Sequence, residues 1–143
     1  MTLASLRIAA RVEQLAAAVA FVEQGADRFG LSAKQQFAVT LALEEAFVNV
    51  CHHAYPHGTG EVELACGGEG DLFVLAISDG GVPFDILSLP APDLTTDIME
   101  RKIGGLGVHF IRTLADRVSY RREGQRNVLR MCFARSPSAG GAL

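Results

Sequence analysis

The first third of the chain carries apolar residues at helical spacing. Over residues 12–29 they return every three or four positions, and Gly30 follows as the residue type that most often ends a helix. The same density of apolar residues continues over residues 33–54, until Pro56 disfavours helical geometry in the residue before it. The pattern predicts two consecutive helices. A short alternation over residues 3–10 predicts a strand before them.

Alternation with a period of two is typical of the strands predicted in the rest of the chain. Turns are expected at residues 67–70 and at Glu123-Gly124, where glycines interrupt the alternation. The run that ends at Ser78 is more continuously apolar than the others, which is typical of a central strand. The predicted strands are residues 61–66, 72–78, 117–122 and 127–134. Helices combined with strands in this order predict an α+β domain.

Residues 82–102 stand apart because they combine three prolines with several acids and show little periodicity. A segment of this length without regular structure is more often functional than incidental, so we expect a mobile lid. An apolar stripe then predicts a third helix over residues 106–116. Residues 136–143, rich in Ser, Gly and Ala, are predicted to be a frayed tail after a single domain over residues 1–135.

Composition and charge exclude several classes of function. The chain has 143 residues, enough for one domain around one core, and its formal net charge is −3. No run of Lys or Arg exceeds two residues, which argues against binding the phosphate backbone of DNA or RNA. The three cysteines are scattered, so we expect neither a disulfide framework nor a zinc site, and no apolar run is long enough for a membrane span. A protein of the cytoplasm is the expectation.

The second predicted helix holds acid and amide side chains in an otherwise apolar stretch. Glu45 and Asn49 are four residues apart, so they project from one face of the helix. Apolar residues cover the other directions, which predicts a helix buried all round. Each unsatisfied polar group there would cost about 1–3 kcal/mol, so a ligand is expected. Glu45 is a candidate general base and Asn49 a candidate ligand of Mg²⁺; an internally paired polar couple is the alternative.

A carboxylate ends the predicted central strand, where Asp79 is followed by Gly80 and Gly81. It can accept a hydrogen bond from a ligand amine while the glycines let a flat ring approach. Such a site favours adenine over guanine, because guanine has a carbonyl oxygen where adenine has its amine. The alternative is an ordinary Asp-Gly turn between strands.

Glycines also surround the start of the third predicted helix, at Gly104, Gly105 and Gly107. Free backbone N–H groups at a helix start bind phosphate oxygens, and glycine permits close approach. Arg101 and Lys102 lie just upstream and offer further phosphate contacts. The alternative is a tight connection with no ligand.

These three segments, in this order, resemble the GHKL (histidine-kinase-like) ATPases, and among them the bacterial anti-sigma factor serine kinases. The first box of that family, Glu-Ala-x-x-Asn-x-x-x-His-Ala-Tyr, is matched by Glu45, Ala46, Asn49, His53, Ala54 and Tyr55. The second, Asp-x-Gly-x-Pro-Phe-Asp, is matched by Asp79, Gly81, Pro83, Phe84 and Asp85. The third is matched by Gly104, Gly105, Leu106 and Gly107. The resemblance covers nearly the whole chain.

The resemblance implies a Bergerat-type ATP-binding fold: a two-layer α/β sandwich with a mixed, mostly antiparallel sheet and helices on one face. It implies that Glu45 is the base for a protein serine hydroxyl, that Asn49 holds Mg²⁺ and that Asp79 reads the adenine amine of ATP. Gly81 would give access to the base, and Gly105 and Gly107 would face the phosphates. The implied nucleotide-binding set also includes Phe84, Lys102, Gly104 and Leu106.

The function implied by the resemblance is a serine/threonine-protein kinase that acts as an anti-sigma factor. It would bind a sigma factor and phosphorylate a serine of an anti-sigma-factor antagonist protein, and homodimers are common among such kinases. The alternative is a non-catalytic module that binds ATP or ADP and uses the bound state to choose its partner. The catalytic half of a sensor histidine kinase is disfavoured, because Glu45 stands where those kinases usually have asparagine.

Overall fold

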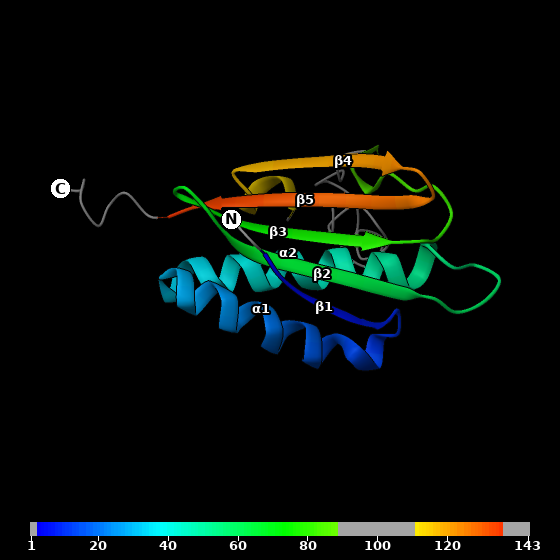
Figure 1. Ribbon diagram of the computed structural model, residues 1–143, viewed down its shortest axis with the longest axis horizontal. Helices are drawn as coiled ribbons and strands as arrows, with labels where there is room; N and C mark the ends of the chain where they lie inside the picture. The colour runs from blue at the N-terminus through cyan, green and yellow to red at the C-terminus, as the bar shows by residue number, and fades with distance from the viewer. Residues whose placement is uncertain (1–2, 89–110, 136–143) are drawn as a thin grey trace, which may run out of the picture.

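Two consecutive helices begin and end at local signals in the sequence. The computed structural model describes residues 3–88 and 111–135 (Figure 1). Helix α1 (Leu15–Phe29) follows a short 3-10 helix, η1 (Val12–Gln14), and ends at Gly30, which has a φ of 93°. Helix α2 (Ala33–His53) begins with a reciprocal cap, in which the Ser32 hydroxyl accepts a hydrogen bond from Gln35 N and Gln35 Oε1 accepts one from Ser32 N. Both predicted helices are confirmed.

Five strands form one sheet in the order β1-β2-β3-β5-β4, and each neighbouring pair is antiparallel. The strands are β1 (Ala4–Ala9), β2 (Glu61–Glu69), β3 (Leu72–Asp79), β4 (Arg117–Glu123) and β5 (Arg126–Ala134). Strand β3 lies in the middle, as its continuous apolar run predicted. The short 3-10 helix η2 (Ile86–Ser88) follows β3, and residues 111–114 are helical, which agrees with the predicted third helix.

The turn predicted at residues 67–70 begins too early, because β2 continues through Gly67 and Gly68 to Glu69. A Cβ atom on Gly68 would lie 2.5 Å from the Phe29 ring, so glycine is needed there for the ring to pack against the strand. The chain turns at Gly70, the last residue of the predicted range, which has a φ of 60°.

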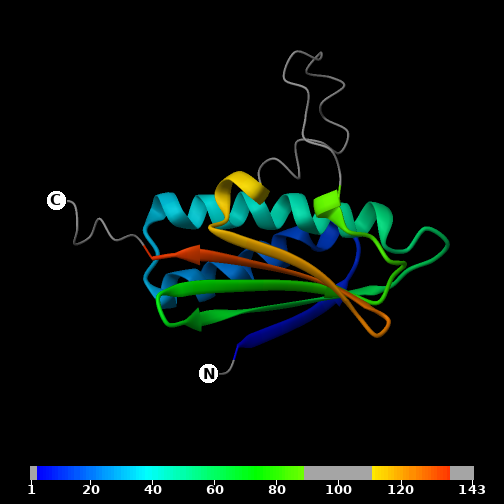
Figure 2. The same cartoon turned by 90° about the horizontal axis from the view of Figure 1, so that it is seen from above.

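Helices and sheet form two layers, with α1 and α2 side by side on one face of the sheet (Figure 2). The core between the layers includes Val22 of α1, Leu43 and Phe47 of α2, and Phe73 and Leu75 of β3, all fully buried. Each such side chain contributes roughly 1.5–3 kcal/mol through burial. The α+β class and the placement of helices on one face are therefore confirmed.

Helix α2 is not buried all round, and that prediction is wrong. Its buried residues are Val39, Ala42, Leu43, Ala46 and Phe47, which lie on one face. Phe37 is 69% exposed, and Glu45 is only partly buried. The helix covers the sheet as an outer layer, so only one of its faces meets the core. Among the described residues, no helix is long and apolar enough to cross a membrane.

Three segments that are distant in sequence meet at one end of the sandwich. They are the C-terminal end of α2, the C-terminal end of β3 and the turn between β4 and β5, which lie together on the right of Figure 1. We call this end the site end. Of the predicted lid, residues 82–88 are described and end in η2, while the rest lies outside the described residues, as does the predicted tail.

Candidate functional site

Asp79 is the most deeply buried acid at the site end, with 3% of its surface exposed. It is the last residue of β3 and lies opposite Asn127 of β5. Its Oδ1 atom accepts hydrogen bonds from Gly81 N at 2.8 Å and from Asn127 Nδ2 at 2.9 Å. No hydrogen bond within residues 3–88 and 111–135 reaches its Oδ2 atom. One carboxylate oxygen is therefore fixed by the protein, and the other is left for a ligand.

A hollow of about 380 Å³, its mouth included, lies beside Asp79 between α2 and the sheet. Its apolar lining comes from Ala46, Val50, Ala54, Ile77, Phe84, Ile86 and Leu129, and its polar lining from Asn49, Asp79, Tyr120 and Asn127. Apolar walls with a few convergent polar groups are typical of a small-molecule site. The structure therefore brings the predicted site residues Asn49, Asp79 and Phe84 together around one hollow.

Asn49 and Glu45 lie one turn apart on α2, and the helix itself orients the amide. Asn49 Nδ2 donates a hydrogen bond to the backbone oxygen of Glu45 at 2.8 Å, so the nitrogen is internally paired. The side-chain oxygen of Asn49 has no hydrogen-bond partner among the described residues and remains available as an acceptor or a metal ligand. The predicted alternative of internal pairing therefore holds for the side-chain nitrogen of Asn49 but not for its side-chain oxygen.

Glu45 is partly buried and does not line the hollow itself. Burial raises the pKa of its carboxyl above the ordinary value of 4.5, and the neighbouring Glu44 raises the pKa further. A carboxylate with a raised pKa is a better proton acceptor near neutral pH. The electrostatics thus suit the predicted general base, while the catalytic role itself stays a prediction.

The C-terminal end of α2 is attached to the loop after Asp79 by backbone contact. Val82 N donates a hydrogen bond to Ala54 O at 2.8 Å, and the His53 ring stacks on Phe84 with centroids 4.8 Å apart. A Cβ atom on Gly81 would lie 2.1 Å from Ala54 O. Glycine is therefore needed at residue 81 for the two backbones to meet, whatever access it gives to a ligand.

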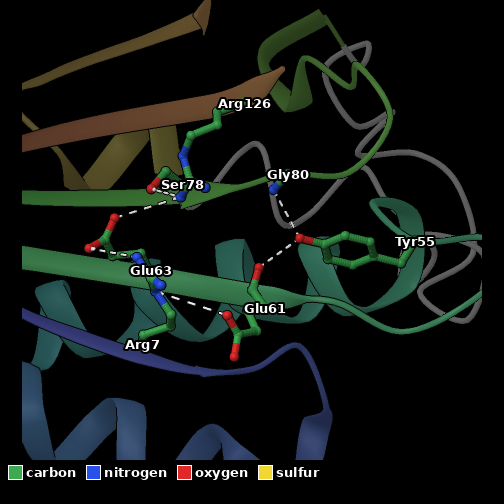
Figure 3. Close-up of polar contacts among 7 residues, drawn as sticks. All are labelled: Arg7, Tyr55, Glu61, Glu63, Ser78, Gly80 and Arg126. Atoms are coloured by element: carbon green, nitrogen blue, oxygen red, sulfur yellow. Dashed lines mark hydrogen bonds and ion pairs between the residues drawn. The ribbon is translucent and has the colours of Figure 1, made fainter. Parts of the chain in front are cut away.

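Tyr55 makes the second attachment (Figure 3). Its hydroxyl donates a hydrogen bond to Glu61 O at 2.7 Å and accepts one from Gly80 N at 2.9 Å. The ring lies so close to Gly60 that a Cβ atom there would be 2.1 Å away. The His-Ala-Tyr segment of the first box thus holds the Asp-Gly-Gly segment of the second in place, which gives a physical reason for their occurring together.

The charged residues in Figure 3 belong to the face of the sheet that the helices leave uncovered. Arg126 Nη2 lies 3.7 Å from Glu63 Oε1 and donates a hydrogen bond to the Ser78 hydroxyl at 2.9 Å. Arg7 Nη2 lies 3.9 Å from Glu63 Oε2. Exposed ion pairs of this kind contribute about 0–1 kcal/mol each. They balance charge across strands β1, β2, β3 and β5 and do not line the hollow.

The hairpin formed by β4 and β5 contributes three residues to which the sequence assigned no role in the site, although two of them, Tyr120 and Asn127, match the usual ending of the family that the chain resembles. The three residues are Tyr120, Arg122 and Asn127. Arg122 Nη1 donates a hydrogen bond to Gly81 O at 2.8 Å, in the loop after Asp79. Asn127 is 5% exposed and is the first inward-facing residue of β5. A polar residue in phase with Leu129 and the other inward apolar residues is a signal that the sequence did contain.

Two further predictions remain to be placed. Lys102, Gly104, Gly105, Leu106 and Gly107, predicted to contact phosphates, lie outside the described residues. Asp85 of the second box has a local role, because its Oδ1 atom accepts a hydrogen bond from Leu87 N at 2.8 Å and so caps η2.

Comparison with known proteins identifies the family of this chain. Serine-protein kinase RsbW of Bacillus cereus is 29% identical over 115 residues, which cover 78% of this chain and 72% of the relative. The proteins of the same name from Bacillus mycoides and Bacillus thuringiensis are 27% and 28% identical over equal shares. The family model of the histidine kinase-like ATPase domain matches residues 8–133, which begin within β1 and end within β5. The chain therefore belongs to the histidine kinase-like ATPase domain family.

Proposed function

We propose that this protein is an RsbW-like serine kinase that binds Mg-ATP in the hollow beside Asp79. The observation that carries the proposal is the Asp79 carboxylate, which is buried, held at one oxygen by two N–H donors and, among the residues that the structure describes, unpaired at the other. A buried acceptor that the protein leaves unpaired is costly unless a ligand donor meets it. The exocyclic amine of adenine is such a donor.

The walls of the hollow fit the rest of the base. Ile77, Ile86 and Leu129 offer apolar surface to a flat ring, and Phe84 is fixed by its stack on His53. Guanine would turn a carbonyl oxygen toward the Asp79 carboxylate, and two acceptors facing each other repel. The residues therefore suit a 6-aminopurine better than a 6-oxopurine.

The phosphate side would be served by α2. Asn49 presents a side-chain oxygen because its nitrogen is held by Glu45 O, and an amide oxygen is a suitable ligand for Mg²⁺. Glu45, with its raised pKa, would accept the proton of a protein serine hydroxyl. When bound, Mg-ATP would supply the phosphoryl group and the cation that offsets its charge. The protein would contribute mainly position and electrostatics.

The partners follow from the resemblance to anti-sigma factor serine kinases and from the similarity to proteins named serine-protein kinase RsbW. We propose a sigma factor as the binding partner and an anti-sigma-factor antagonist protein as the serine substrate. The bound nucleotide would then influence which of the two is held.

The test is phosphoryl transfer from γ-labelled Mg-ATP to candidate antagonist proteins of the same cell. Glu45→Gln should lower the transfer rate by about 10²-fold or more, the size of a general-base contribution, while ADP binding is retained. Glu23→Gln is the matched control, because it makes the same chemical change at an exposed position of α1 that neither lines the hollow nor contributes to the raised pKa of Glu45. It should keep most of the activity.

Three outcomes separate the alternatives. Normal transfer by Glu45→Gln would show that the assigned base is wrong. Nucleotide binding that alters partner affinity without any phosphoprotein would favour the non-catalytic switch module. Absence of calorimetric heat with both Mg-ATP and Mg-ADP would reject the proposal as a whole.

A further inference from the structure

Asn127 makes more side-chain hydrogen bonds than any other residue around the hollow, and its two amide atoms face different partners. On the donor side, Nδ2 donates to Asp79 Oδ1 at 2.9 Å and to Val82 O at 2.8 Å. Both protons of the amide nitrogen are therefore used, one on the carboxylate and one on the loop that follows it.

The acceptor side of Asn127 fixes which way the amide points. Its Oδ1 atom accepts from the Tyr120 hydroxyl at 2.5 Å, from Phe84 N at 3.2 Å and from Arg122 Nη1 at 3.2 Å. Rotating the amide by half a turn would place its NH₂ group against the donors Phe84 N and Arg122 Nη1, and its oxygen against the acceptor oxygens of Asp79 and Val82. These four contacts would then become repulsive, and only the Tyr120 hydroxyl, which can also accept, would still be satisfied. Asn127 is thus locked with its nitrogen toward Asp79.

This lock determines the orientation of the Asp79 carboxylate. Asn127 Nδ2 and Gly81 N both bind Oδ1, so the carboxylate plane is set by two donors from different segments. Asp79 and Asn127 both line the hollow, and no hydrogen bond from the described part of the chain reaches the Oδ2 atom of Asp79. Without the donor from Asn127, Gly81 N alone would hold the group, and the carboxylate could turn about its last side-chain bond.

We infer that Asn127 is the positioning residue that gives this site its preference for a 6-aminopurine over a 6-oxopurine. The inference rests on the proposed nucleotide function and assigns its base selectivity to a residue outside the three sequence boxes. A site built to hydrogen-bond one ligand group rejects an analogue by leaving buried groups unpaired, but only if those groups cannot reorient. Asn127 removes that freedom from Asp79.

The experiment measures the ratio of the dissociation constants of Mg-IDP and Mg-ADP by isothermal titration calorimetry on the whole chain. These diphosphates differ at position 6 of the base and cannot transfer a γ-phosphoryl group. The unmodified protein should prefer ADP by at least about tenfold. Asn127→Asp, which removes both donors and sets a second carboxylate opposite Asp79, should lower the ratio at least about fivefold.

Asn127→Ser guards against loss of folding in the charged variant. Serine adds no charge and offers one hydroxyl in place of a two-donor amide, so the ratio should fall about threefold or more. Gln125→Glu is the matched control, since it makes the same amide-to-carboxylate change at an exposed position of the same hairpin. It should leave the ratio unchanged. Melting curves establish that each variant is folded.

A residue that only stabilised the hairpin would weaken ADP and IDP equally. An unchanged ratio in folded Asn127→Asp, or in Asn127→Ser where the aspartate variant does not fold, therefore overturns the inference while leaving the proposed function intact. If the unmodified protein binds no ADP, the proposed function fails and this inference fails with it.

Discussion

At each end of the sandwich a glycine lets another group approach the backbone closely, but the approaching group differs between the two ends. At the end opposite the site, the Phe29 ring packs against Gly68, between the Phe73 ring and the guanidinium of Arg135, whose carbon lies 4.1 Å from the ring centroid. At the site end, the Ala54 carbonyl packs against Gly81. Glycine permits close approach in both places, but a side chain approaches at one end and the backbone at the other.

The difference lies in how much each contact can adjust. An apolar ring can shift by a few tenths of an ångström and keep most of its packing energy, since dispersion and burial are not directional. The backbone at Ala54 is fixed by its hydrogen bond from Val82, and the Gly81 amide is fixed by Asp79. Rigidity is therefore concentrated where a ligand would be recognised, which suits a site that must be preformed.

The largest effect is expected for Gly81→Ala. The added Cβ atom would lie 2.1 Å from the Ala54 oxygen, and neither backbone can move without breaking the bonds that position Asp79. We expect a loss of about 3 kcal/mol in the free energy of unfolding, measured by urea denaturation, together with loss of ADP binding. The steric clash is with backbone atoms of Ala54, so no flexible side chain can move away to relieve it.

Gly80→Ala is the control for that variant, because a Cβ atom there would meet only the Tyr55 hydroxyl at 3.9 Å and Gln125 O at 4.0 Å. These are ordinary contacts, so the change in unfolding free energy should stay within about 0.5 kcal/mol. Equal effects of the two alanines would mean that flexibility of the loop, and not the contact with Ala54, is what glycine supplies.

Gly68→Ala tests the opposite end and should cost about 1 kcal/mol. The Cβ atom would lie 2.5 Å from the Phe29 ring, and the ring can yield by turning away at the expense of its contacts with Phe73 and Arg135. Affinity for ADP should be unchanged, since the hollow lies at the other end of the sheet. Urea denaturation and calorimetry on the same preparation check both parts, and a loss of ADP affinity here would contradict the separation of the two ends.

Local signals made the helices predictable. Gly30, the Ser32 cap and Pro56 act within a few residues, so the bounds of α1 and α2 could be predicted from the sequence. The turn after β2 was predicted too early, because Gly68 serves tertiary packing and not a turn: it accommodates the ring of Phe29, which lies far away in sequence. The same residue type serves turns and close packing, and composition alone does not distinguish the two.

The site was predictable where polarity interrupts a pattern. Asp79 and Asn49 were found because they stand in apolar runs, and both line the hollow. Asn127 carries the same signal in β5, yet its importance depends on pairing with Asp79, 48 residues away in sequence. Strand register decides that pairing, and register depends on the whole sheet. The degree of burial of α2 was overestimated for a related reason, since composition does not show which face of a helix meets the core.

The smallest stability effect is expected for Glu45→Gln, and its sign follows from the raised pKa of Glu45. The folded protein binds the Glu45 proton more tightly than the unfolded chain does, because burial and Glu44 disfavour the charged form. The ionised carboxylate therefore destabilises the fold, and this penalty grows as the pH rises above the ordinary value of 4.5. Glutamine carries no charge, so the variant should melt slightly above the unmodified protein at neutral pH. The difference should vanish in acid below that value.

Glu23→Gln on α1 is the control, because it removes an equal charge from an exposed position. It should show no comparable gain with pH. Melting temperatures recorded from acid to neutral pH check the prediction, and a gain for Glu45→Gln that increases toward acid would contradict it. Together with the loss of phosphoryl transfer expected for the same variant, slightly higher stability would mark Glu45 as a residue whose placement costs the fold stability. Gly81, at the site end, would show the opposite behaviour, since its replacement should cost stability and ligand binding together.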